Sequence, residues 1–170
     1  DSFRMPDECA ATLIAMRLGI LTRPELQKLL AFTLQTDQGP ARNPFDISGI
    51  MKVIHKAHPQ EPNVAERWAE EAINAILSEG SADRAKKSGF KLGPIASALS
   101  LRGHGFEKIM RFVEGTDLKG PQDPFDIASI ARMMDPGQAD QWATIALIAR
   151  LTTAICDALT PASHHPAPHA

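Results

Sequence analysis

The sequence predicts an all-α protein, and three observations carry the prediction. Ala, Leu, Ile and Met are abundant, Tyr is absent and aromatic residues make up 5% of the chain, a composition that favours helices over strands. Apolar residues recur at the three- and four-residue spacing of helices. The segment 36–47 also returns as 116–127, 80 residues later (116 minus 36). We therefore predict a tandem duplication of a roughly four-helix unit, packed as one compact helical bundle with pseudo-two-fold symmetry.

The first unit is predicted to cover residues 1–78, and its first two helices come from simple signals. A helix from Asp7 or Glu8 to about Leu21 is apolar enough to be mostly buried. Pro24 begins the second helix, because a proline in the first turn loses no hydrogen bond. We expect this helix to turn its large apolar side chains to one side, namely Leu26, Leu29, Leu30 and Phe32.

The third and fourth helices follow the repeated segment. We expect Asn43 to be the N-cap of the third helix, Pro44 to lie in its first turn and Asp46 to reach back from the third position. Asn63 is expected to cap the fourth helix, which turns Trp68 inward. The first unit thus ends at the last turn of this helix.

A change of composition separates the two units. Residues 79–91 are mostly small, polar or basic, and we predict that they form a linker. The second unit covers residues 92–160, and its Trp142 matches Trp68 at an offset of 74 (142 minus 68), so the connector before it is six residues shorter (80 minus 74). The last helix is expected from about Ala139 to Leu159. The tail, residues 161–170, is rich in Pro and His and is predicted to be flexible.

Charge and cysteine content limit the possible partners. The net charge of -2 gives no general attraction to nucleic acid or anionic lipid. Cys9 and Cys156 stand at opposite ends without a CxxC spacing, which disfavours disulfides and a zinc cage and favours a reducing cytoplasm. Arg17 and Arg150 interrupt the longest apolar stretches, so we expect no membrane helix or membrane partner. We also expect no cofactor.

The repeated corners have two interpretations. In the first they close the loops before two helices, with Phe45 and Phe125 as anchors to the core. In the second they meet near the pseudo-axis and offer Asp37, Asp46, Asp117 and Asp126 to a cation or a basic partner. The loops lack the alternating ligands of an EF-hand, which argues against calcium. The residues predicted as structural corners are Asn43, Pro44, Phe45, Asp46, Asp123, Pro124, Phe125 and Asp126.

The linker between the units is the candidate site for a charged ligand. Basic residues cluster here in the sequence, and Gly103 and Gly105 leave backbone N–H groups accessible at the start of a helix, where phosphate binds well. An ordinary solvated linker is the alternative. The candidate residues for phosphate or nucleic acid are Arg84, Lys86, Lys87, Lys91, Arg102, His104 and Lys108.

Support for catalysis is weak. The spacing of His55, His58 and Glu61 is suited to a transition metal, which leaves a metal-dependent enzyme as an alternative. Pro59 breaks the helix between two of these residues, so a solvated helix end explains the histidines equally well. We find no GxSxG or HExxH motif and no cysteine with an evident partner, so the prediction leans away from an enzyme.

The leading hypothesis is a non-enzymatic helical module that binds another protein, or itself. Two surfaces are candidates: a groove between the two units, and the apolar last helix. On that helix the partner-binding residues would be Ile145, Leu147, Ile148 and Leu151. The competing hypothesis is a regulator that contacts nucleic acid or a phosphate-bearing ligand through the basic linker.

Overall fold

The chain folds entirely from helices. The computed structural model describes residues 9–39, 43–78, 81–103 and 105–159, and within these ranges there are nine helices and no strand. The all-α prediction is confirmed for this part of the chain, while the predicted flexible tail, 161–170, lies outside it. The helices are α1 (Ala10–Arg17), α2 (Pro24–Gln38), α3 (Ile47–Ala57), α4 (Asn63–Leu77), α5 (Ser81–Lys87), α6 (Gly93–Ala98), α7 (Glu107–Lys119), α8 (Ile127–Met133) and α9 (Pro136–Leu159).

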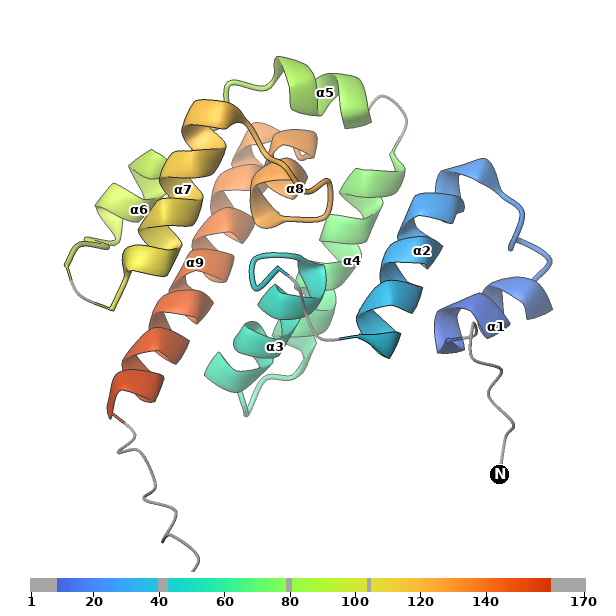
Figure 1. The fold of residues 1–170 in the computed structure, drawn as a ribbon, viewed down its shortest axis with the longest axis horizontal. Coiled ribbons are helices and arrows are strands. Elements are labelled where there is room, and N and C mark those ends of the chain that lie inside the picture. Colours follow the sequence, from blue (N-terminus) through green and yellow to red (C-terminus); the bar gives the residue numbers. More distant parts are fainter. Residues whose placement is uncertain (1–8, 40–42, 79–80, 104, 160–170) are drawn as a thin grey trace, which may run out of the picture.

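Helices α3, α4, α8 and α9 form the centre of the molecule (Figure 1). Helix α3 buries one side there, and its Ile50 and Ile54 have no exposed surface. Trp68 of α4 is buried as predicted, and its Nε1 donates to the carbonyl oxygen of Trp142 in α9 at 3.2 Å. With 24 residues, α9 is about 36 Å long at 1.5 Å per residue and crosses the whole body.

Two pairs of helices lie on opposite sides of this centre (Figure 1). We name α1 and α2 the first flank, and α6 and α7 the second flank. In the second flank, α6 packs on both α7 and α9. In the first flank, α1 packs mainly on α2. The second flank is therefore joined to the longest central helix, whereas α1 lies at the edge of the molecule.

The first helix is much more exposed than its sequence predicts. It buries Ala15, but Leu13, Ile14, Met16 and Leu18 are between 41% and 65% exposed. The prediction of a mostly buried helix is wrong because α1 has the side of α2 as its main neighbour. The helix also ends at Arg17 rather than at Leu21, since Gly19 takes a φ of +68° and terminates it. The predicted start at Asp7 or Glu8 lies outside the described residues.

The predicted linker contains a helix. Within the segment 79–91, α5 packs against α8 and also touches α4. Its Ala, Arg and Lys residues have high helix propensity, and Ala85 is half-buried against its neighbours. The change of composition at this point therefore marks a short covering helix in addition to a connection. Among the helices of the described residues, none combines the length and the apolarity that crossing a membrane requires.

Candidate functional site

The two corners that precede α3 and α8 lie side by side and are hydrogen-bonded to each other. The backbone N–H of Ile47 donates to the carbonyl of Phe125 at 3.1 Å, and the N–H of Ile127 donates to the carbonyl of Phe45 at 3.0 Å. Between these bonds, Asp46 and Asp126 face each other as an antiparallel pair. Two segments that are 80 residues apart (126 minus 46) thus form a reciprocal link.

The caps of the helices that follow differ from the predicted ones. Asp46 is the N-cap of α3, and its Oδ1 accepts from the N–H of Gly49 at 2.8 Å. Asp126 is the N-cap of α8, and its Oδ1 accepts from the N–H of Ser129 at 2.8 Å. The prediction that Asn43 caps the third helix is wrong, because each helix begins one residue after the aspartate and not at the proline.

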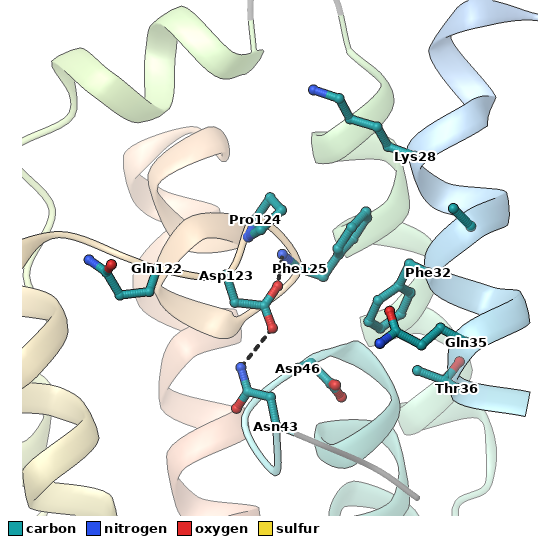
Figure 2. A pocket seen from close by; sticks show the side chains of 11 residues that line it. Lys28, Phe32, Gln35, Thr36, Asn43, Asp46, Gln122, Asp123, Pro124 and Phe125 are labelled. Atoms are coloured by element: carbon teal, nitrogen blue, oxygen red, sulfur yellow. Dashed lines mark hydrogen bonds between the residues drawn. The ribbon is translucent and has the colours of Figure 1, made fainter. Parts of the chain in front are cut away.

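Asn43 and Asp123 instead close the turns before these caps. The Oδ1 atom of Asn43 accepts from the N–H of Phe45 at 2.9 Å, and Oδ1 of Asp123 accepts from the N–H of Phe125 at 2.9 Å. Such a bond, from a side chain to a backbone group two residues on, stabilises a turn and competes with helix formation. Nδ2 of Asn43 also donates to Oδ2 of Asp123 at 2.8 Å, which ties the two turns together (Figure 2).

The paired caps are buried carboxyl groups with altered acidity. Asp46 is 3% exposed and Asp126 is 2% exposed. Burial raises the pKa of Asp126 from its usual 3.8 to about 6, and the negative charge of Asp123 adds to the effect, while the bond from the Ser129 N–H opposes it. Burial likewise raises the pKa of Asp46. The corners therefore hold acidic groups whose charged form is disfavoured.

The cation site expected as an alternative at these corners is not formed by the described residues. Asp117, near the end of α7, turns its side chain to the start of α6, where its two carboxylate oxygens accept from the N–H groups of Leu92 and Gly93 at 3.0 and 2.8 Å. Asp37 is exposed near the end of α2, whereas Asp46 and Asp126 are buried as caps. Within the described ranges, no three His, Cys, Asp or Glu side chains are grouped to hold a metal ion.

Two stacked ring pairs join the corners to the flanks. Phe45 stacks on Phe112 of α7 with ring centroids 4.0 Å apart, and Phe125 stacks on Phe32 of α2 at 4.3 Å. Phe45 is also covered by the guanidinium of Arg150, which lies 5.0 Å from its ring centroid. Each phenylalanine thus anchors its corner, as predicted, but against the flank of the other half of the chain.

A cavity of about 560 Å³ opens between α2 and the second corner. Figure 2 shows side chains of α2, among them Lys28 and Phe32, facing Asp123, Pro124 and Phe125 across this space. Its lining is mostly apolar by area. The residues around it are Lys28, Ala31, Phe32, Gln35, Thr36, Asn43, Asp46, Gln122, Asp123, Pro124 and Phe125.

A second cavity, of about 590 Å³, continues along the first half of α2. Its other walls are the end of α4, α5, α8 and the second corner, and its apolar side chains include Leu29, Ile76 and Met133. Four residues line both cavities, namely Lys28, Gln122, Pro124 and Phe125. We name the two cavities together the α2 groove.

The basic residues of the predicted charged site are spread over the molecule. Nη1 of Arg84 donates to the carbonyl of Met133 at 3.1 Å and to Oδ1 of Asp135 at 3.2 Å. Nζ of Lys91 donates to the carbonyl of Asp117 near the end of α7. Lys108 lies at the opposite end of that helix, nine residues from Asp117 (117 minus 108), or about 14 Å along the axis.

Part of the predicted charged site does lie at a cavity. A space of about 500 Å³ between α5 and the start of α9 is lined by Arg84 and Lys87, by Asp135 and Ser88, and otherwise by apolar residues and a glycine. Arg102 is exposed in the connection between α6 and α7. The side chain of Lys86 and all of His104 lie outside what the structure describes. The structure therefore brings together two of the seven basic candidates at this cavity.

The last helix is largely a core element. Leu147 is completely buried, and Ile145 and Leu151 are partly buried against the core. Ile148 is 40% exposed. A partner cannot reach Leu147 in this fold, so of the four predicted contact residues Ile148 alone has a broadly exposed side chain.

The predicted metal ligands lie around the end of α3. His55 is exposed, and Nδ1 of His58 lies 3.9 Å from Oε1 of Glu61, which is an exposed pair. Those three side chains are not grouped as a metal site in the described residues. The histidines instead stand at the end of a helix, where a positive charge suits the dipole.

Sequence reasoning missed the α2 groove because α2 and the second corner, which line it together, are more than 80 residues apart in the chain. Lys28 is not predicted as a binding residue from the sequence, although it matches Lys108 at the offset of 80 residues. The corner phenylalanines were recognised as anchors, but not as part of a groove wall. Comparisons with protein-family models, curated proteins and solved structures find no match for this chain.

Proposed function

We propose that this chain is a non-enzymatic protein-protein interaction module that binds its partner in the α2 groove. The observation that carries the proposal is the groove itself, two adjoining cavities of about 560 and 590 Å³ with mostly apolar linings along one helix. Cavities of this size and character are typical of sites that bury another molecule. An amphipathic helix whose apolar side is open to a groove is a usual way to recognise a partner segment.

The incomplete burial of α2 supports the proposal. None of its 15 residues is buried, although Leu29 and Phe32 pack against the core. In α7, the corresponding helix of the second half, Ile109, Val113 and Thr116 are buried. Apolar surface left open in a monomer commonly marks a binding surface.

The proposal includes the duplicated architecture predicted from the sequence. We propose two helical units, residues 1–78 and 92–160, related by a pseudo-two-fold axis near the pair formed by Asp46 and Asp126. The reciprocal bonds between Ile47 and Phe125 and between Ile127 and Phe45 support this arrangement. The α2 groove then lies between the units. A cytoplasmic setting also belongs to the proposal, supported by the free thiols of Cys9 and Cys156.

A photo-crosslinking experiment tests the proposed function. Benzoylphenylalanine is placed at Ala31, which lines the groove, and in a control at Arg111, which is the exposed residue 80 positions later on α7. We expect irradiation in the native cell to capture one protein from position 31 and not from position 111. The captured protein is then purified and titrated against this chain by calorimetry. A second copy of this chain is one outcome of the capture. Equal capture at both positions, or none at position 31, would contradict the proposal.

A second candidate function is a regulator that binds a phosphate-bearing ligand or nucleic acid between α5 and α9. The supporting observation is the cavity of about 500 Å³ that Arg84 and Lys87 line. A fluorescent single-stranded RNA is the probe. For this function, its binding should fall steeply with salt and disappear when Lys86 and Lys87 are changed to Glu. No binding at low salt would remove this candidate.

A further inference from the structure

The shape and charge of the α2 groove indicate which kind of segment fits it. Resting on the proposed function, we infer that the groove takes an amphipathic helix of a partner protein, with an apolar stripe against α2 and an acidic side chain beside Lys28. The inference concerns the chemistry of the occupant and goes beyond the choice of the groove as the binding surface.

The groove has the length of a short helix. Its lining runs along α2 from Pro24 to Thr36, twelve residues (36 minus 24), which is about 18 Å at 1.5 Å per residue. A partner helix of three to four turns spans this length. The apolar side chains along it come from five elements, so a stripe of side chains at positions i, i+3, i+4 and i+7 meets mostly apolar surface.

The walls favour a helix over an extended strand. An added strand needs a row of free backbone donors and acceptors, which the edge of a sheet supplies. The walls here are mainly helices, which offer no continuous row of free backbone donors and acceptors. The loop wall contains Pro121 and Pro124, which have no N–H to donate. A helix satisfies its own backbone and therefore loses little in this groove.

Charge complementarity identifies the flank of the occupant. Among the described residues, four charged side chains line the groove: Lys28 and three acidic residues, each of which already accepts a hydrogen bond or lies near a cation. Asp46 and Asp123 accept hydrogen bonds within the corners, and Glu25 lies 3.9 Å from Arg23. Lys28 lines both cavities, is exposed and has no acidic partner among the described residues. A carboxylate on the occupant beside Lys28 would give this lysine an acidic partner.

Two stapled helical peptides of about 14 residues test the inference, a length that covers the groove. Both carry a Leu stripe on an Ala background, and they differ at one flanking position, Glu in the acidic probe and Lys in the basic probe. Binding of the fluorescent probes to the full chain is followed by anisotropy. We expect the acidic probe to bind about 3- to 10-fold more tightly, as expected when an exposed attraction replaces a repulsion.

Three variants locate the effect. Lys28→Glu should reverse the preference between the probes, whereas Lys108→Glu, the matched change 80 residues later on α7, should leave it unchanged. Ala85→Trp fills the groove without removing a packed group and should weaken both probes at least about 10-fold. Circular dichroism confirms that each variant is folded.

Several outcomes would overturn the inference. These are no binding of either probe at millimolar concentration, an unchanged preference in Lys28→Glu, and tighter binding of a proline-rich probe of the same length. If photo-crosslinking from position 31 still captures a partner while the probes fail, the groove remains a binding site and only the helical, acidic occupant is wrong. If both fail, the proposed function is wrong as well.

Discussion

The two flanks of this molecule have similar parts but differ in how tightly they pack. In the second flank, α7 buries Ile109, Val113 and Thr116. The residues 80 positions earlier on α2 are Leu29, Thr33 and Thr36, and none of them is buried. At this position α2 has the polar Thr33 where α7 has the apolar Val113, so α2 has one apolar side chain fewer to pack. The first flank is therefore the looser one, and it is also the wall of the α2 groove.

The central helices beside the two flanks also differ in length. The second flank packs on α9, which has 24 residues, whereas α4 beside the first flank has 15. At 1.5 Å per residue, α9 is longer by about 14 Å. Helix α6 packs on α9, and its Ala96 is completely buried. The open helix of the first flank and the more buried helix of the second flank thus have unequal neighbours as well as unequal side chains.

The largest expected effect compares the two flanks directly. Ile109→Ala should lower the free energy of unfolding by about 2–5 kcal/mol, because Ile109 is 4% exposed and its removal leaves a cavity in packed surroundings. Leu29→Ala should cost about 1 kcal/mol, since a half-buried side chain loses less contact with its neighbours. Urea unfolding measures both. Equal costs would show that the first flank is as tightly packed as the second.

An intermediate effect is expected from the corners. Gly49→Ala should lower the free energy of unfolding by about 2–3 kcal/mol, because the new Cβ would lie 2.6 Å from the carbonyl oxygen of Pro44. The matched residue of the second corner is Ser129, whose Oγ donates to the carbonyl of Asp123 at 2.7 Å. Ser129→Ala should cost about 1 kcal/mol for the lost bond. Thermal unfolding compares the two, and a harmless Gly49→Ala would mean that the first corner relaxes more easily than its geometry indicates.

The smallest expected effect is a pH dependence located in the second corner. The pKa of Asp126 is raised from 3.8 to about 6 in the folded chain. The stabilisation that the protonated side chain gives the fold is therefore fully present below about pH 4 and is lost as the pH rises through 6. Asp126→Asn keeps a capping oxygen but does not titrate. The variant should therefore gain about 1–2 kcal/mol relative to the wild type between pH 4 and pH 8.

Chemical unfolding at several pH values measures this gain, with Asp46→Asn as the control in the other corner. The pKa of Asp46 is also raised by burial, so its substitution should shift stability in the same direction. Parallel pH curves for the wild type and Asp126→Asn would show that Asp126 is ionised in the folded chain at the same pH as in the unfolded one.

Local pattern was enough to predict the helical class and the inward positions of several helices. Trp68 is buried as predicted, and α3 buries Ile50 and Ile54 at helical spacing. The capping pattern was less reliable, because a proline after an asparagine fits both a helix start and the turn before one. Here the side chain of Asn43 bonds to the N–H of Phe45 and so selects the turn.

The exposure of α1 and the presence of the groove depend on packing between distant segments, which the sequence pattern did not predict. The apolar residues of α1 predict burial, but their exposure depends on whether another helix covers them, and α1 has the side of α2 as its main neighbour. The groove depends on the pairing of Phe32 with Phe125, which joins residues from opposite halves of the chain. The repeat indicated that the corners are related, although it carried no information on their distance from each other.

The hydrogen bonds between the corners also have a consequence for the order of events during synthesis. The first corner is hydrogen-bonded to Phe125 and Ile127 and therefore cannot be completed until the chain has been translated through the second. At about 5–20 residues per second, the ribosome needs roughly 4–16 s to make the 80 residues that separate Asn43 from Asp123. Phe45 is only 5% exposed in the complete fold, but during that interval the nascent first half lacks the segment that covers it. The carbonyl of Phe45 likewise lacks its hydrogen-bond donor, the N–H of Ile127, until that residue has been made.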